Sequence, residues 1–247
     1  MKAVVLLSGG LDSAVCAAMA AEQFGNENVY PITFTYGQRH RREIDAASKI
    51  ASHMGLQRLR LIEVGSEIFE RSILVDESQE VPTGTYQQVN EEAAVSPMYV
   101  PFRNGVFLSL AAAYAMTVDA GYVFYGGHKD DSRNWAYPDT TPEFNDAMAE
   151  AIYVGTYQKV QLAAPLAQMT KSDVVLATYR LEVPIKLTYS CYKGGYLHCG
   201  ECSTCKQRIQ AFKDVYLQDE VKYAIDVEWS IAEIADTIDL QGGQNFD

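Results

Sequence analysis

Long hydrophobic runs are missing from this sequence. No apolar stretch reaches the roughly 18 residues that a membrane-spanning helix requires, so we expect no membrane partner. The N-terminal segment MKAVVLLSGG carries one Lys and a short apolar run that a glycine pair ends, which favours a first core strand over a signal peptide. We therefore expect a cytoplasmic protein.

Positive charge is also scarce. The 247 residues include 20 Lys and Arg against 32 Asp and Glu, which gives a formal net charge of −12. Because Lys and Arg supply most of the nonspecific affinity for nucleic acid, we expect no direct nucleic-acid partner. The segment GQRHRR at 37–42 is the most basic stretch, and a solvated helix start is its simpler interpretation.

Cysteine is sparse outside one cluster. Of five cysteines, Cys16 stands alone among alanines and is expected to pack in the core. The other four read C-x7-C-x2-C-x2-C, a spacing typical of a closed structural zinc site. These four expected metal ligands are Cys191, Cys199, Cys202 and Cys205. An iron–sulfur centre and disulfide redox chemistry are the alternatives. The candidate counter-charges for the thiolates are Lys193, Lys206 and Arg208.

Apolar strand-like runs alternate with helical patterns along the chain. Strands are expected at 3–7, 29–36, 58–64 and 122–127, and helices at 11–24, 39–54, 104–118, 142–153 and 171–181. Such alternation predicts an α/β fold, a Rossmann-like parallel sheet with helices on both faces. We expect residues 1–187 to form this core, with an insertion at about 65–99. Residues 188–247 are expected to add the cysteine motif and C-terminal helices within the same domain.

The segment SGGLDS at 8–13 lies between the first predicted strand and the first helix. Glycines allow a close backbone approach, and a helix N-terminus presents free N–H groups to phosphate. Ser8 and Ser13 add hydroxyl donors, and Asp12 can orient the loop or hold a metal ion. The spacing is neither that of the ordinary P-loop nor G-x-G-x-x-G. A simple glycine turn before a helix cap is the alternative.

In this position S-G-G-x-D-S resembles the pyrophosphate loop of the PP-loop ATP pyrophosphatases. The resemblance implies that ATP is cleaved between its α and β phosphates and that the substrate is adenylated. The implied ATP-binding residues are Ser8, Gly9, Gly10, Leu11, Asp12, Ser13, Ala14, Val15, Cys16, Ala17 and Ala18.

Further stretches narrow the resemblance. YGQRHRREIDAA (36–47), VPFRN (100–104), YPDTTPEF (137–144), APLAQMTKSD (164–173) and the cysteine cluster occur in this order. Over about residues 2–217 the chain is similar to the 7-cyano-7-deazaguanine synthase family. Membership implies a homodimeric ligase that uses 7-carboxy-7-deazaguanine, ammonia and ATP with Mg²⁺, and that holds one structural Zn²⁺. Phe102 and the pair Thr140–Thr141 depart from the Gly and the Cys-Arg that many members have there.

The implied chemistry needs positioning of the substrate and charge stabilisation of the departing pyrophosphate. The expected catalytic residues are Asp12, Ser13, Arg103 and Lys171, of which Arg103 and Lys171 provide positive charge. An alternative places Lys171 in the exposed first turn of a helix that Thr170 and Asp173 cap.

Substrate contacts are expected in two places. Arg39 and His40 lie just beyond a strand end, where ligands of open α/β sheets bind. The loop after the strand at 122–127 carries carboxylates that can accept the donors of a guanine-like base, with a tyrosine for stacking. Its candidates are Asp131, Tyr137, Asp139 and Glu143.

Two other functions are compatible with these motifs. One is a PP-loop tRNA-modifying enzyme of the thiolase kind, against which the acidic charge argues. The other is a nucleotide-binding zinc module without catalysis. The segment SIAEIADTI (230–238) has its Ile residues on one helical face and is expected to pack on the core or on a second subunit.

Overall fold

The computed structural model describes residues 1–229 except 39–40, 71, 77, 86–87 and 90–95. The predictions for Arg39, His40 and the helix at 230–238 therefore lie outside the described residues. At the centre is one sheet of five strands, in the order β3-β2-β1-β4-β5. The strands are β1 (Ala3–Leu6), β2 (Val29–Thr35), β3 (Arg60–Glu63), β4 (Tyr122–Phe124) and β5 (Gln161–Ala163). All four pairings are parallel, so the predicted fold class is confirmed.

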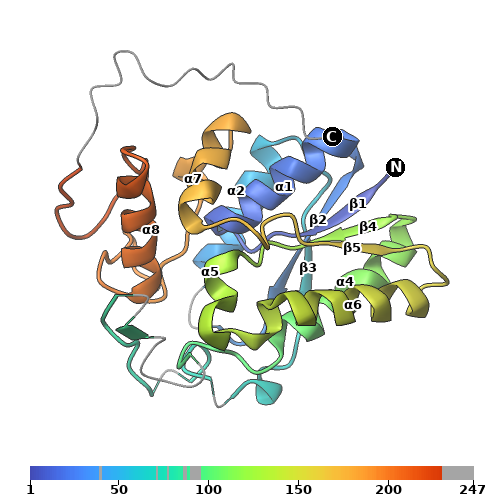
Figure 1. Ribbon diagram of the computed structural model, residues 1–247, viewed down its shortest axis with the longest axis horizontal. Helices are drawn as coiled ribbons and strands as arrows, with labels where there is room; N and C mark the ends of the chain where they lie inside the picture. Colours follow the sequence, from blue (N-terminus) through green and yellow to red (C-terminus); the bar gives the residue numbers. More distant parts are fainter. Residues whose placement is uncertain (39–40, 71, 77, 86–87, 90–95, 230–247) are drawn as a thin grey trace.

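Helices cover both faces of this sheet (Figure 1). Three helices, α1 (Leu11–Phe24), α2 (Arg42–His53) and α7 (Lys171–Arg180), pack on one face. Two others, α4 (Arg103–Val118) and α6 (Pro142–Gly155), cover the other face. Each parallel connection crosses over the sheet through a helix, which brings the starts of several helices to the carboxyl edge of the strands.

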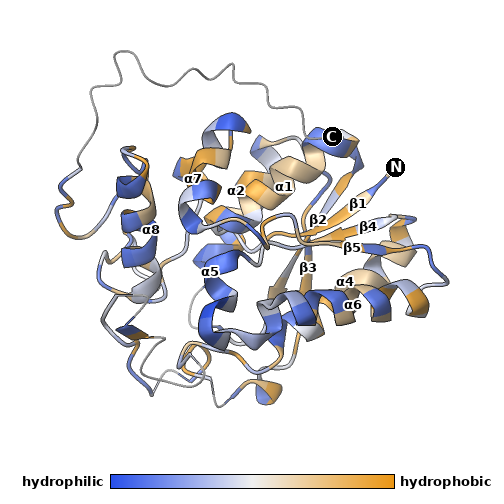
Figure 2. Ribbon diagram, in the orientation of Figure 1, coloured by the Kyte–Doolittle hydropathy of each residue, from blue (hydrophilic) through white to orange (hydrophobic). Residues whose placement is uncertain are grey.

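The hydropathy of the elements explains these layers. The strands and α1 are mainly hydrophobic in Figure 2, whereas the short helix α5 (Lys129–Ser132) is mainly hydrophilic. Ala3, Val4 and Val5 in β1 are fully buried because both faces of a parallel sheet are covered. The small side chains of α1 allow close packing on β1, and Cys16 is buried there as expected.

The C-terminal part of the described chain packs on the first layer of helices. Helix α8 (Ser203–Asp214) lies against α7. The guanidinium of Arg208 forms a bidentate ion pair with Asp219, at 2.6 and 2.9 Å, and both side chains are fully buried. Arg208 is therefore paired with a carboxylate, and its charge also acts on Cys205 of the cluster. Tyr223 donates a further hydrogen bond to Asp219.

Described residues of the expected insertion at 65–99 pack against this core. Phe69, Leu74 and Met98 are buried beside α4, and Thr83 forms a β-bridge with Cys202. This segment therefore connects the second face of the sheet with the cysteine loop. The remaining short elements are the 3-10 turns η1 (Asn26–Asn28), η2 (Ser66–Ile68), η3 (Arg133–Trp135), η4 (Pro138–Thr140) and η5 (Ile185–Leu187).

Among the described residues, no helix combines the length and the apolar character that crossing a membrane requires.

Candidate active site and metal site

A cavity of about 270 Å³ opens at the carboxyl ends of β1, β2 and β4. This is where ligands of open α/β sheets bind. Its lining combines the loop after β1 with the starts of α2, α4 and α7. Polar and aromatic residues at the wall include Ser8, Asp12, Ser13, Tyr36, Glu43, Arg103, Tyr137, Lys171 and Tyr192. Elements far apart in the sequence therefore form one site.

The glycine loop after β1 is held tightly against α2. Gly9 has a φ of +94°, and a Cβ there would lie 2.2 Å from the carbonyl oxygen of Glu43. No side chain fits that space, so glycine is required at this position. The hydroxyl of Ser13 accepts from the Ser8 N–H at 3.1 Å and donates to the Gly10 carbonyl at 3.0 Å. The start of α1 therefore points its N–H groups into the cavity in a fixed arrangement.

The resemblance-based ATP residues divide into two groups. Ser8, Gly10, Asp12 and Ser13 line the cavity. Gly9, which packs against α2, does not line it, and neither do Leu11 and the stretch 14–18, which are buried in the core around α1. Most of the predicted ATP-binding residues therefore pack in the core that supports the loop and do not face the cavity.

An ion pair crosses the floor of the cavity between α1 and α7. The Nζ atom of Lys171 lies 2.5 and 2.6 Å from the two carboxylate oxygens of Asp12. Burial alone would raise the pKa of Asp12, but the ammonium of Lys171 and the nearby His128 hold it below its ordinary value. Asp12 is therefore ionised at neutral pH and holds the Lys171 side chain beside the phosphate-binding loop.

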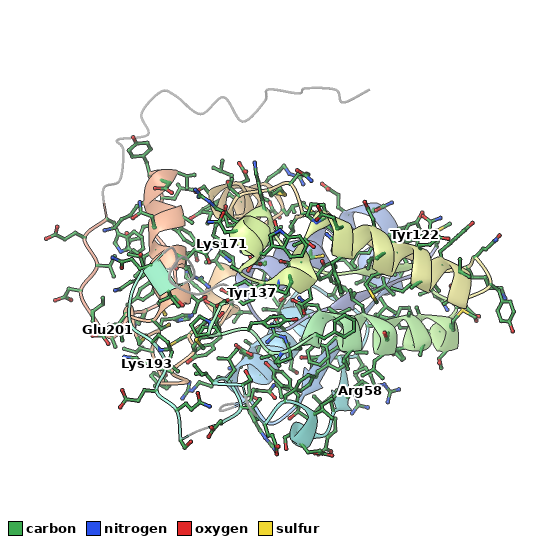
Figure 3. The ribbon with its side chains drawn as sticks, turned by 60° about the horizontal axis from the view of Figure 1, so that its bottom comes forward. Arg58, Tyr122, Tyr137, Lys171, Lys193 and Glu201 are labelled. Carbon is green, nitrogen blue, oxygen red and sulfur yellow. The ribbon has the colours of Figure 1, made fainter. Side chains whose placement is uncertain are left out.

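The alternative interpretation of Lys171 is half right. Thr170 and Asp173 do form a capping box at the start of α7. Lys171 itself is 8% exposed, however, because its side chain turns inward to Asp12. Figure 3 shows Lys171 near Tyr137 in the middle of the molecule.

Arg103 is the first residue of α4 and extends into the same cavity. Its Nη1 donates a hydrogen bond to the Tyr36 hydroxyl at 3.0 Å. Burial alone would lower the pKa of Arg103, but Tyr36 and Asp139 raise it, so the guanidinium stays charged. Arg103 therefore brings a second cation to the site.

Of the four candidate substrate contacts in the loop after β4, two line the cavity and two do not. Asp131 and Tyr137 line the cavity. Asp139 does not line it: its carboxylate accepts the backbone N–H of Asn104 at 2.9 Å and so caps the first turn of α4. Glu143 is exposed and borders a neighbouring apolar groove beside Phe102.

The three positions that depart from the family pattern also lie in different places relative to the cavity. Phe102 has a left-handed backbone, with φ of 54°, and its ring is half exposed. Thr140 lines the main cavity, whereas Thr141 caps α6 by accepting the Phe144 N–H at 3.2 Å. Of the three residues, only Thr140 is placed to contact a ligand in that cavity.

Several wall residues were not singled out from the sequence. The most notable is Glu43 in the first turn of α2, where burial raises the pKa of the carboxyl to about 7. Tyr36 and Tyr192 add two hydroxyls. A charged residue in the first turn of a helix that follows a strand is a usable signal, because that turn lies at the ligand-binding edge.

The four clustered cysteines meet in one place beside the start of α8. Their sulfur atoms all lie within 4.8 Å of one another, with Cys199 and Cys205 3.9 Å apart. Cys199 Sγ accepts the backbone N–H groups of Glu201 and Cys202 at 3.4 and 3.2 Å. Figure 3 shows Lys193 and Glu201 together at the edge of this loop, where they form an exposed ion pair.

The donor set fits a single metal ion. Four sulfurs at about 2.3 Å from a tetrahedral zinc lie roughly 3.8 Å apart, close to the separation found here. A four-iron cluster would bind each sulfur to a different iron and hold the sulfurs farther apart. The cysteines can therefore hold a metal ion without rearrangement of the backbone.

Comparison with known proteins agrees with this geometry. The model of the family "Queuosine biosynthesis protein QueC" matches residues 2–216. A 7-cyano-7-deazaguanine synthase of Oceanobacillus iheyensis is 42% identical over 226 residues, 90% of this chain and 98% of that protein. One of Thermoplasma acidophilum is 39% identical over 226 residues, 90% of this chain and 92% of that protein.

Among solved structures, a U34-tRNA thiolase NcsA from Methanococcus maripaludis with its [4Fe-4S] cluster has a TM-score of 0.49 and 18% identity. That match covers 87% of this chain and 67% of the thiolase.

Proposed function

The chain belongs to the QueC family, and we propose that it is an ATP-dependent ligase that converts 7-carboxy-7-deazaguanine and ammonia into 7-cyano-7-deazaguanine. The observation that carries the proposal is one cavity in which the pyrophosphate loop, the Asp12–Lys171 pair and an aromatic wall meet. ATP and a planar base can therefore lie next to each other in this cavity.

The proposed reaction has two activations. A carboxylate oxygen of the base attacks the α phosphorus of ATP, and the bond to pyrophosphate breaks. Ammonia then attacks the acyl carbon and loses a proton, AMP leaves, and an amide remains. The amide oxygen then attacks the α phosphorus of a second ATP, and a second pyrophosphate leaves. Loss of AMP and both amide protons gives the nitrile. Each step requires close positioning of two reactants more than covalent help from the protein.

The residues have separable roles in this proposal. Ser8, Gly10 and Ser13 hold the β and γ phosphates through N–H and hydroxyl groups. Lys171, oriented by Asp12, stabilises the charge of the departing pyrophosphate, and Arg103 adds positive charge at the opposite wall. Asp139 orients Arg103 indirectly, because it fixes the first turn of α4.

Two metal ions belong to the proposal. Mg²⁺ accompanies ATP, since this ion binds protein sites mainly through substrate phosphates. Zn²⁺ occupies the four-cysteine site, and a set of four sulfurs with no open position supports a structural role for that ion. The zinc would stabilise the loop at 188–202 and the start of α8, and with them Tyr189 and Tyr192 at the cavity wall.

The family and the composition support the rest of the proposal. We expect a cytoplasmic homodimer that acts on free small molecules and does not bind nucleic acid directly. Residues 1–187 and the cysteine region form one domain, as the packing of α8 on α7 supports. Light scattering tests the dimer, which has twice the 27.4 kDa of one chain.

Pyrophosphate release tests the function. The protein should release pyrophosphate when 7-carboxy-7-deazaguanine, ammonium and ATP are all present, and mass spectrometry should detect the nitrile. Without the base, release should fall to background. If the base with ammonium does not stimulate release, the proposal is wrong.

A further inference from the structure

Three carboxylates line the main cavity, and two of them have partners. Asp12 is paired with Lys171 at 2.5 Å. Asp131 lies 3.5 Å from the Nε2 atom of the buried His128. The carboxylate of Glu43 has neither a hydrogen bond nor an ion pair with the described residues of the protein. Glu43 is partly buried, and its carboxylate faces the open cavity with no donor from the described residues, so this position suits a ligand that brings donors.

Arg103 faces the same cavity from another element. Glu43 belongs to the first turn of α2, and Arg103 is the first residue of α4. The charge of Arg103 acts on Glu43, yet the two side chains form no ion pair at 4 Å or less. Arg103 donates through Nη1 to Tyr36, which leaves other N–H groups of the guanidinium for a ligand. The cavity therefore has an acceptor and a donor on separate walls.

We propose that Glu43 and Arg103 together recognise the hydrogen-bonding edge of the 7-deazaguanine ring. In this arrangement Glu43 accepts the N1–H and one N–H of the 2-amino group, and Arg103 donates to O6. A guanine edge has one acceptor beside two donors, and a carboxylate can accept the two donors side by side. The inference rests on the proposed function and names the residues that select its substrate.

The backbone gives Glu43 a fixed position for this role. Its carbonyl oxygen packs directly below Gly9 of the pyrophosphate loop, so α2 cannot shift without moving that loop. The base would then be held at a set distance from the phosphates. Tyr137 and Tyr192 line the same cavity and offer aromatic surface to a planar ring.

An analogue without the 2-amino group tests the proposal on the unmodified protein. The wild-type enzyme should prefer 7-carboxy-7-deazaguanine over the corresponding hypoxanthine-type base by about 100-fold or more in kcat/KM, because the analogue leaves the carboxylate poorly paired. A preference below about tenfold would overturn the proposal without the need for any variant.

Glu43→Gln should then remove most of that preference. The variant keeps the shape and loses the charge, so kcat/KM for the guanine-type base should fall about tenfold or more, while the analogue should lose little. The KM for ATP should stay within about twofold, which also shows that the variant is folded. Glu150→Gln is the matched control, since Glu150 is exposed on α6, and it should behave as wild type.

Each other outcome has a defined meaning. If Glu43→Gln raises the KM for ATP or ammonium and leaves the base preference intact, Glu43 does not recognise the base. If Glu143→Gln removes the preference instead, recognition belongs to the loop after β4. If the wild-type protein does not turn over 7-carboxy-7-deazaguanine, the proposed function fails and the inference fails with it.

Discussion

The ion pair between Asp12 and Lys171 is the contact whose loss should affect turnover most directly. Asp12→Ala removes the carboxylate that orients the ammonium beside the pyrophosphate loop. We expect turnover to fall about 100-fold or more, the effect of roughly 2.7 kcal/mol in the barrier. The protein should still fold, because a quarter of the Asp12 side chain is exposed and water can reach the site. Steady-state kinetics and thermal melting measure the two effects.

Glu22→Gln is the control on the same helix. It breaks the pair between Glu22 and Arg180, in which both side chains are more than half exposed, and should leave turnover unchanged. Activity of Asp12→Ala within about threefold of wild type would rule out the proposed role.

Among the elements, the cysteine loop should depend on its metal ion. Cys202→Ser removes one of four ligands, so we expect the bound zinc to be lost and the melting temperature to fall, with lower activity as a consequence. Metal analysis and calorimetry measure these changes. Cys16→Ala is the control: it disturbs the core around α1 and should keep one zinc per chain. Iron with sulfide in the wild-type protein would contradict the zinc assignment.

The buried pair of Arg208 and Asp219 holds the end of the described chain against α8. Asp219→Asn leaves the guanidinium without its counter-ion and should lower the free energy of unfolding by about 3–5 kcal/mol. Glu220→Gln, next in sequence and in an exposed pair with Lys186, should change it by less than about 1 kcal/mol. Urea unfolding at neutral pH compares the two variants, and equal effects would contradict the structural role of Asp219.

The same pair has a defined pH dependence. Burial alone would raise the pKa of Asp219, but Arg208 holds it below the ordinary value of 3.8. A carboxyl with a lowered pKa in the folded state stabilises the protein above its ordinary pKa, and this contribution is lost as the pH falls through the folded value. The difference in the free energy of unfolding between wild type and Asp219→Asn should therefore stay constant from pH 7 to about 4. It should become smaller only below about pH 4.

Local sequence patterns predicted the long elements well. Helix α1 runs from Leu11 to Phe24 as its spacing indicates, and four of the five strands were found. Strand β5 was missed because its three residues, Gln161–Ala163, are too short to show alternation. The helix expected from residue 39 is described from Arg42.

The wall of the site was harder to predict than the loop. The sequence predicted Lys171 as a catalytic cation but left an exposed position open, because its partner, Asp12, lies 159 positions away. Asp139 looked free for a ligand, yet its carboxylate caps α4. Glu43 was overlooked because its position in the first turn after a strand, the one local signal it offers, was not used. Such features depend on which helices the sheet order brings together, and periodicity carries no information about that order.

For the molecule as a whole, the negative net charge should prevent binding to nucleic acid. With a net charge of −12, the protein should retain no tRNA on a filter at about 0.1–0.2 M salt, because few cations are available to neutralise phosphates. A basic nucleic-acid-binding protein under the same conditions is the positive control. Salt-sensitive retention of tRNA by this protein would instead favour an RNA-modifying enzyme.

The position of β1 at the centre of the sheet affects how the protein is made. The ribosome synthesises this strand and the pyrophosphate loop well before their neighbours β4 and Lys171. Until then one edge of β1 has no hydrogen-bonding partner, and Asp12 has no counter-ion. Pairing over such long sequence separations is slow and leaves strand edges open to association. A nascent chain that stalls before Lys171 would therefore contain the nucleotide loop but lack a complete nucleotide site. Chaperones and proteases would then encounter a sheet that lacks some of its strands.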